Sequence, residues 1–278
     1  MRASDIHPAF GVEITGLDLT DELRPDARAV VRRTFDQRSL LLVRGAGLDV
    51  LDQDRFCRML IDDQGPGMAS RRAPMLVSNT EPGGYAPWGR LLFHADMMWA
   101  PEPFQVLSLY AMTADPGAAT TTFASGTRAW ERLPRQLRRQ IDGLHVEHVT
   151  GQVYSRGGGD LLVPERTVAQ STVTRIVRTH PRTGRPILYV SEQMTSRVVE
   201  LPDDESEALL QELFDVLYDP TEVYEHTWQV GDLVVFDNLA LQHARGNVLA
   251  DGPARTLRKV IAPVPEMAAE VPIFARPD

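Results

Sequence analysis

Short segments in which apolar and polar residues alternate recur along the chain, and they predict a protein built mainly from β-strands. Near the N-terminus, "FGVEITGLDL" alternates as a strand with one buried face does. From about residue 75 onward such segments are rich in β-forming residues and are separated by turns containing glycine or proline. Further predicted strands are "LLLVRGAGL", "MLVSN", "RLLFHADMMW", "VLSLYAMTA", "TTTFAS", "HVEHV" and "RTLRKVIAPV".

Helical spacing of apolar residues is confined to a few segments. The clearest is "DDESEALLQELFDVLYD", where Asp204 is the predicted N-cap and Glu207 follows three residues later. Other predicted helices are "DARAVVRRTFDQRS", "LDQDRFCRMLIDDQ" and "TRAWERLPRQLRRQIDGL", the last interrupted near Pro134. Many antiparallel strands with a few helices suit a jelly-roll barrel that carries helical additions.

Two further segments predict strand pairs, and one predicts a loop. "RIVRTHPRTGRPILYVS" is typical of a hairpin around "PRTGRP", and "YEHTWQVGDLVVFDN" of a strand, a turn and a strand. By contrast, "TGQVYSRGGGDLLVPERTVAQ" has no clean period and contains three consecutive glycines. We expect a mobile loop there, and residues 151–172 are a candidate lid over a binding site.

Composition excludes several classes of protein. The 278 residues are 43% hydrophobic and 24% charged, as in ordinary soluble domains. A net charge of −9 argues against general binding to nucleic acid or anionic membranes, which need a positive surface. The single cysteine, Cys57, cannot form an internal disulfide, and the N-terminus lacks an apolar signal core, so we expect a cytoplasmic protein. Lys259 is the only lysine, and this preference for arginine suggests a GC-rich bacterial source.

The pattern that indicates chemistry is His94-x-Asp96 in "FHADMMW". Residues two apart on a strand face the same way, so both side chains could reach one metal ion. "DNLALQHARG" offers His243 as a third ligand. Two histidines and one carboxylate make the facial triad of non-haem Fe(II) oxygenases, which leaves coordination positions open for a 2-oxo acid and dioxygen.

A 2-oxo acid has a far carboxylate that needs a cation, and arginine binds such a group through two parallel hydrogen bonds. Arg255 lies twelve residues after His243, on the next predicted strand. A nearby hydroxyl group could donate a further hydrogen bond to this carboxylate, and "ATTTF" offers Thr120, Thr121 and Thr122.

With these residues in place, the chain resembles the taurine dioxygenase family of Fe(II)/2-oxoglutarate-dependent oxygenases. The resemblance runs from "HPAFGVEITGLDL" through "FHADMMW", "SGTRAWERLP", "THPRTGRPILYVS" and "WQVGDLVVFDNLALQHAR" to "RTLRKVIAPV". It implies one domain over residues 1–278, mainly β with helical additions, and a double-stranded β-helix (jelly-roll) core. It also implies iron held by the residues matching His94, Asp96 and His243.

The resemblance further implies that 2-oxoglutarate is held by the residues matching Arg255 and Thr121, the latter because it lies four residues before "SG". Many relatives have an arginine four residues after the 2-oxoglutarate arginine, where it binds the substrate's sulfonate or carboxylate. Here that residue is Lys259, a single point charge, so taurine itself is disfavoured and the substrate stays open. Met97, just after the iron aspartate, is expected to line the substrate pocket.

We therefore predict an enzyme that uses Fe(II), 2-oxoglutarate and O2 to oxidise an unactivated C–H bond of a small anionic or zwitterionic metabolite, releasing succinate and CO2. Hydroxylation, desaturation and ring closure would use the same residues. The alternatives are a zinc-dependent hydrolase or a non-catalytic binding barrel on the same fold; neither would need Arg255. The sequence does not specify an oligomeric state, although such enzymes often form dimers or tetramers.

Overall fold

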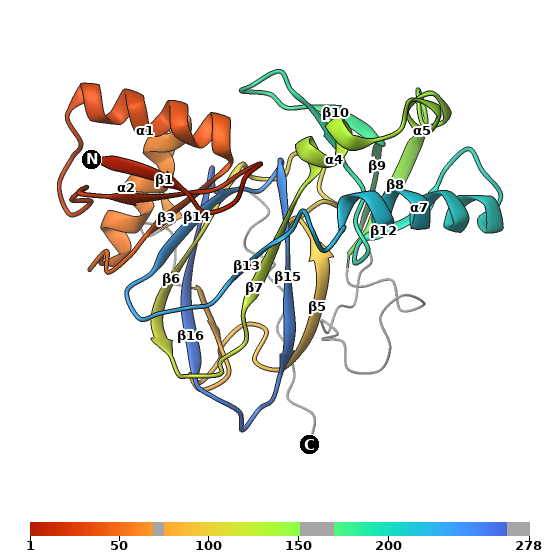
Figure 1. The fold of residues 1–278 in the computed structure, drawn as a ribbon. Coiled ribbons are helices and arrows are strands. Elements are labelled where there is room, and N and C mark those ends of the chain that lie inside the picture. The colour runs from red at the N-terminus through yellow and green to blue at the C-terminus, as the bar shows by residue number, and fades with distance from the viewer. Residues whose placement is uncertain (69–74, 151–169, 266–278) are drawn as a thin grey trace.

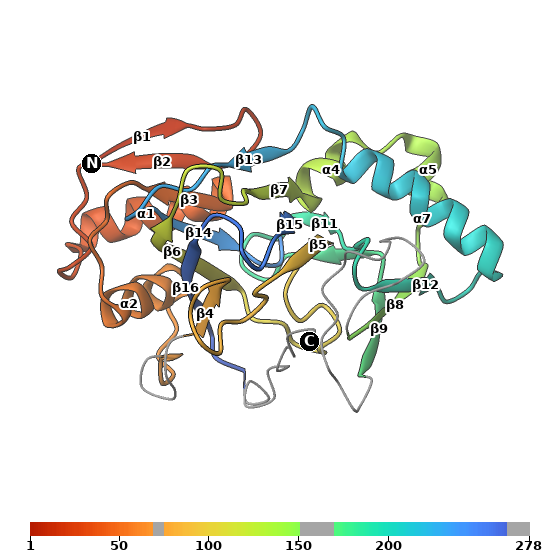
Figure 2. The same ribbon diagram turned by 90° about the horizontal axis from the view of Figure 1, so that it is seen from below.

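The structure is a computed structural model that describes residues 1–68, 75–150 and 170–265. Figure 1 shows two β-sheets at its centre, with α1 (Pro25–Arg38) and α2 (Val50–Ile61) beside one of them. Further helices lie at the opposite end with a smaller sheet and a hairpin, a separation also clear in Figure 2. The prediction of a mainly β protein with helical additions is therefore confirmed.

The larger sheet has seven strands in the order β1-β2-β3-β14-β6-β16-β4, and only the β2–β3 pair is parallel. Its strands are β1 (Arg2–Asp5), β2 (Val12–Thr15), β3 (Leu40–Val43), β14 (Leu233–Asp237), β6 (Val106–Ala114), β16 (Arg255–Ala262) and β4 (Met75–Ser78). The strands β3, β14 and β16 are buried on both faces. The sequences of β3 and β14 are therefore almost entirely apolar, whereas β16 also contains buried polar and charged residues.

The second sheet has four antiparallel strands in the order β13-β7-β15-β5. Its strands are β13 (Tyr224–His226), β7 (Thr121–Ser125), β15 (Leu241–Val248) and β5 (Gly89–His94). The two sheets face each other across aromatic side chains: the Phe123 ring lies 5.0 Å from that of Phe236, which lies 5.1 Å from that of His243. Two facing antiparallel sheets of this kind form a jelly-roll core.

The remaining elements form a second apolar cluster. They are the sheet β12-β8-β9, made of β12 (Thr195–Val198), β8 (His145–Val149) and β9 (Ser171–Arg175), the hairpin β10 (Val177–Thr179) with β11 (Pro186–Leu188), and the helices α4 (Gly126–Arg132), α5 (Arg135–Gln140) and α7 (Asp203–Leu217). The predicted stripe of α7 is buried here, and the predicted hairpin and the helix break at Pro134 are confirmed.

Three local predictions differ from the structure. The N-cap of α7 is Pro202, not Asp204, and no side chain caps it. The fixed φ of Pro202 already suits a helix start, and three acidic residues in the first turn complement the helix dipole. β5 ends at His94, so Asp96 is not on a strand. Of the proposed lid, residues 151–169 lie outside the described residues, while residues 171 and 172 belong to β9.

Within the described parts of the chain, no helix has both the length and the apolarity needed to cross a bilayer.

Candidate metal centre

The pairing of two strands brings His94 and His243 together. β15 runs antiparallel to β5 with His243 directly opposite His94, and their ring centroids lie 4.3 Å apart. Directly opposed residues of an antiparallel pair point to the same face of the sheet. Here that face is the one that meets the larger sheet, because His243 also contacts Phe236 of β14.

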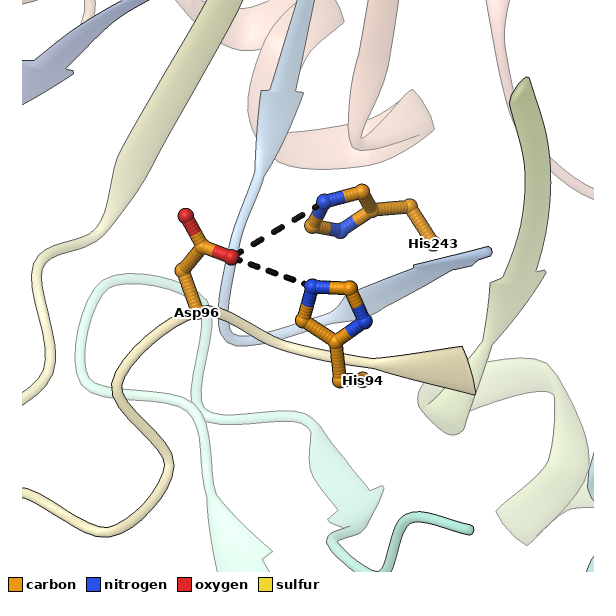
Figure 3. Close-up of side chains that lie close together, drawn as sticks. All are labelled: His94, Asp96 and His243. Carbon is orange, nitrogen blue, oxygen red and sulfur yellow. Dashed lines mark ion pairs between the residues drawn. The ribbon is translucent and has the colours of Figure 1, made fainter. Parts of the chain in front are cut away.

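Asp96 reaches these histidines from a turn. The turn begins just after β5 and is closed by the Ala100 N–H, which donates to the Met97 carbonyl at 2.8 Å. Asp96 Oδ1 lies 3.2 Å from His94 Nε2 and 3.8 Å from His243 Nε2. Dashed lines mark these two pairs in Figure 3. The three potential ligand atoms lie within 4.8 Å of one another. The structure thus brings together the three residues that the sequence singled out, but Asp96 is placed by a turn and not by the alternation of a strand.

The protonation states of the cluster suit a divalent cation. His94 Nδ1 lies 2.8 Å from the Leu92 carbonyl oxygen, which can only accept, so Nδ1 donates to it and Nε2 is the nitrogen turned toward Asp96. Burial, and then the neighbouring His94, hold the pKa of His243 well below its ordinary value, so its imidazole is neutral. Burial alone would raise the pKa of Asp96, but Lys259 and the two histidines leave it well below the usual range.

The donor set of this cluster favours some metal ions over others. Two imidazole nitrogens and one carboxylate oxygen fit a divalent transition metal that keeps further coordination positions open. A closed structural zinc site would need a fourth protein ligand, and the described residues offer no further histidine, cysteine or acid to this cluster. The arrangement is therefore that of a site that leaves room for other ligands.

Lys259 lies at the same cluster. Its Nζ pairs with Asp96 Oδ2, the oxygen not turned toward the histidines, and only 8% of the residue is exposed. The ammonium also lies 5.5 Å from the centre of the Tyr85 ring. The ion pair with Asp96 was not predicted from the sequence, which had assigned this lysine to the substrate.

Arg255 and Thr121 meet between the two sheets, as their predicted joint role requires. Arg255 donates from an NH2 group to Thr121 Oγ1 at 3.0 Å, and Trp228 Nε1 donates to the same oxygen at 3.0 Å. The other two candidate threonines point elsewhere: Thr120 bonds Glu225 at the surface, and Thr122 is only partly buried on the opposite face of β7. Thr121 is thus the residue of the three that faces Arg255.

The guanidinium of Arg255 is buried, and no described acidic residue serves as its counterion. It is 4% exposed, makes no ion pair with any described residue, and its Nε has no hydrogen-bond partner. Burial, and then the charge of Arg245, lower its pKa to about 9. Buried cations are normally paired, so this group fits an anionic ligand that binds between the sheets.

Met97 adopts a left-handed backbone conformation with φ of 59° and packs partly buried against the main core. Its predicted place in a substrate pocket stays a prediction. Sequence reasoning assigned no role to Trp228 or Asn238, although both lie in the segment "WQVGDLVVFDNLALQHAR" that carried the resemblance. Asn238 bonds the backbone of Asp96 through its side chain, a contact that no local pattern signals.

A jelly-roll core with two histidines and one carboxylate between its sheets is typical of a metal centre with open coordination positions. A family model described as "Taurine catabolism dioxygenase TauD, TfdA family" matches residues 2–261, and the chain belongs to this family. It is therefore a dioxygenase of the alpha-ketoglutarate-dependent (2-oxoglutarate-dependent) class.

Characterised relatives act on different compounds. The chain is 27% identical over 276 residues to the alpha-ketoglutarate-dependent 2,4-dichlorophenoxyacetate dioxygenase of Cupriavidus pinatubonensis, covering 92% of this chain and 96% of the relative. It is 28% identical over 294 residues to pentalenolactone F synthase of Streptomyces avermitilis, covering 94% of each.

Solved structures agree on the fold. AAD-2 in complex with Mn(II) and N-oxalylglycine superposes with a TM-score of 0.76 at 25% identity, over 94% of this chain and 96% of that one. A taurine dioxygenase from Burkholderia xenovorans superposes with a TM-score of 0.75 at 23% identity, over 94% and 89% of the two chains.

Proposed function

We propose that residues 1–278 form one Fe(II)/2-oxoglutarate-dependent oxygenase domain that oxidises an unactivated C–H bond of a small anionic or zwitterionic molecule and releases succinate and CO2. One observation carries the proposal: a cluster of His94, Asp96 and His243 shares the space between two sheets with Arg255, a buried cation that has no counterion among the described residues. A metal-dependent hydrolase has no use for that cation, and a binding barrel has no use for the cluster.

In this proposal the metal is held by Nε2 of His94, Nε2 of His243 and Oδ1 of Asp96. When bound with 2-oxoglutarate, Fe(II) supplies the activation of O2 that oxidation of a C–H bond requires. The residues of the chain provide the rest of the function. The bond from His94 Nδ1 to the Leu92 carbonyl leaves Nε2 as the nitrogen available to the metal, and burial keeps the pKa of His243 low, so that its imidazole is neutral and can donate a lone pair.

Arg255 and Thr121 bind the far carboxylate of 2-oxoglutarate. The free Nε of Arg255 offers a donor for a carboxylate oxygen, and Thr121, which accepts from Arg255 and Trp228, still has its own hydroxyl proton to donate. Because Arg255 and Thr121 are both buried, water competes little for these donors and each charge-assisted bond is strengthened.

Lys259 binds the anionic group of the substrate while it stays paired with Asp96. An ammonium has three N–H donors, and the ion pair with Asp96 Oδ2 uses one of them. The others can serve an acid group placed beside the metal. The substrate is thereby oriented by the residue that also neutralises part of the carboxylate ligand's charge, and Met97 in the adjoining turn is proposed to contact its apolar part.

The test is an anaerobic titration of the metal-free protein with Fe(II) and then with 2-oxoglutarate. We expect a weak visible metal-to-ligand charge-transfer band that requires both additions. Full metal occupancy without this band would contradict the proposal and favour a zinc hydrolase or a binding barrel. A screen of small carboxylates, sulfonates and amino acids, followed by succinate formation, would then identify the substrate class.

A further inference from the structure

The turn that carries the Asp96 carboxylate is irregular and does not hold itself in place. Asp96 is followed by Met97 in the left-handed region with φ of 59°, a conformation that is strained for any residue with a β-carbon. Such a conformation persists when the surrounding structure over-determines it. Within the turn, the described hydrogen bond is the one from the Ala100 N–H to the Met97 carbonyl.

Asn238 supplies the missing support. The Asp96 N–H donates to Asn238 Oδ1 at 2.9 Å, and Asn238 Nδ2 donates to the Asp96 carbonyl at 2.9 Å. The side-chain amide thus pairs with both polar groups of one residue, as a neighbouring strand would. Nδ2 donates a further bond to the Phe104 carbonyl at 3.2 Å, and Asn238 is fully buried. Both amide hydrogens and the oxygen are therefore used.

Asn238 is itself fixed in place. Its own N–H donates to the Gln105 carbonyl at 2.8 Å. The preceding residue, Asp237, accepts from the N–H groups of Leu239 and Ala240 at 3.0 Å each and from His180 Nε2 at 2.8 Å. This anchored turn leads directly into β15, which carries His243 five residues after Asn238.

We propose that Asn238 is a positioning residue for the metal centre: it fixes the backbone of Asp96 against the segment that leads to His243, so that the carboxylate is set for the metal before the metal binds. The proposal rests on the proposed metal centre and goes beyond it. It differs from a merely structural role, because a structural amide would change stability without changing metal affinity.

The chain offers a matched control in Gln53 of α2. Like Asn238, it is a fully buried amide with three side-chain hydrogen bonds, to Ser108 Oγ, the Arg258 carbonyl and Arg258 Nε. None of these partners is a candidate metal ligand. Asn238→Ala and Gln53→Ala therefore remove the same number of buried hydrogen bonds, one set at the Asp96 turn and one set on the other face of β16.

The experiment measures the dissociation constant for Mn(II) by calorimetry. Unfolding in urea first establishes a temperature at which the wild type and both variants are folded. Removing an outer partner of a metal ligand weakens metal binding by about 10- to 100-fold, and we expect this for Asn238→Ala. Gln53→Ala should lose stability and keep the wild-type constant. Equal constants for Asn238→Ala and the wild type would overturn the inference, whereas failure of the wild type itself to bind Mn(II) would overturn the proposed metal centre.

A second measurement applies if Asn238→Ala does not fold. In the metal-free wild type, the Asp96 amide should exchange its hydrogen slowly, because Asn238 accepts it in a buried position. Rapid exchange of that amide in an otherwise protected β5–β15 region would show that the turn is not preset, and would equally overturn the inference.

Discussion

Replacing Arg255 by glutamine tests the assignment of the 2-oxoglutarate site most sharply, because the guanidinium is buried and forms no ion pair with any described residue. In the ligand-free protein this charge is held at a cost, as its pKa of about 9 shows, so its removal should leave the free energy of unfolding unchanged or higher. In the complex it would pair with a carboxylate. Losing one partner of a buried, hydrogen-bonded charge pair costs about 2 to 5 kcal/mol. That is roughly a 30- to 5,000-fold rise in the dissociation constant for 2-oxoglutarate.

The matched control is Arg258→Gln, three residues further along β16. Arg258 faces α2, where it donates to Gln53 Oε1, the Leu48 carbonyl and the Asp49 carbonyl. Its replacement should lower the free energy of unfolding and leave 2-oxoglutarate affinity unchanged. The assays are calorimetric titration of the Mn(II)-loaded proteins with 2-oxoglutarate and unfolding in urea. The reasoning is refuted if Arg255→Gln binds 2-oxoglutarate as tightly as the wild type does.

Three further outcomes follow from the same structure. Lys259→Ala should raise the substrate's KM and leave uncoupled 2-oxoglutarate turnover largely intact; a collapse of 2-oxoglutarate affinity would mean that the roles of Lys259 and Arg255 are wrongly assigned. Chelation should abolish 2-oxoglutarate turnover, and Fe(II) but not Zn(II) should restore it; restoration by Zn(II) would favour the hydrolase. Burial, and then Arg178, lower the pKa of His148 to about 3. Below pH 6.5 the unfolded chain therefore binds a proton at His148 that the folded protein does not bind, and the free energy of unfolding falls as the pH falls toward 3. Between pH 7 and pH 5 the wild type should therefore lose about 2 kcal/mol more stability in urea unfolding than His148→Asn does, and equal losses would contradict this.

The strands and helices were predictable where the spacing of apolar residues within one short segment is enough to distinguish a strand from a helix. The alternating segments became strands, and the apolar stripe of α7 is buried, because burial of one face follows directly from spacing. The cap of α7 was missed because Asp204 and Pro202 both suit a helix start, and the fixed φ of proline settles the choice. The sequence cannot weigh two such signals against each other.

At the site, the residue types were predictable from the sequence, whereas their meeting depends on contacts between distant segments. His94 and His243 face each other because β5 and β15 pair in that register, which depends on the whole sheet. Asp96 lies in a turn in which Met97 has a left-handed backbone conformation. Asn238, 142 residues later in the sequence, holds this turn through hydrogen bonds to the backbone of Asp96. Contacts of this length, like the ion pair between Lys259 and Asp96, leave no periodic trace in the sequence.

The most direct test of the central claim is anomalous X-ray diffraction from crystals grown without O2 in the presence of Fe(II), measured on both sides of the iron absorption edge. We expect one strong peak within bonding distance of Nε2 of His94, Nε2 of His243 and Oδ1 of Asp96. A peak bound elsewhere, or full iron occupancy with any of these three atoms turned away, would contradict the account.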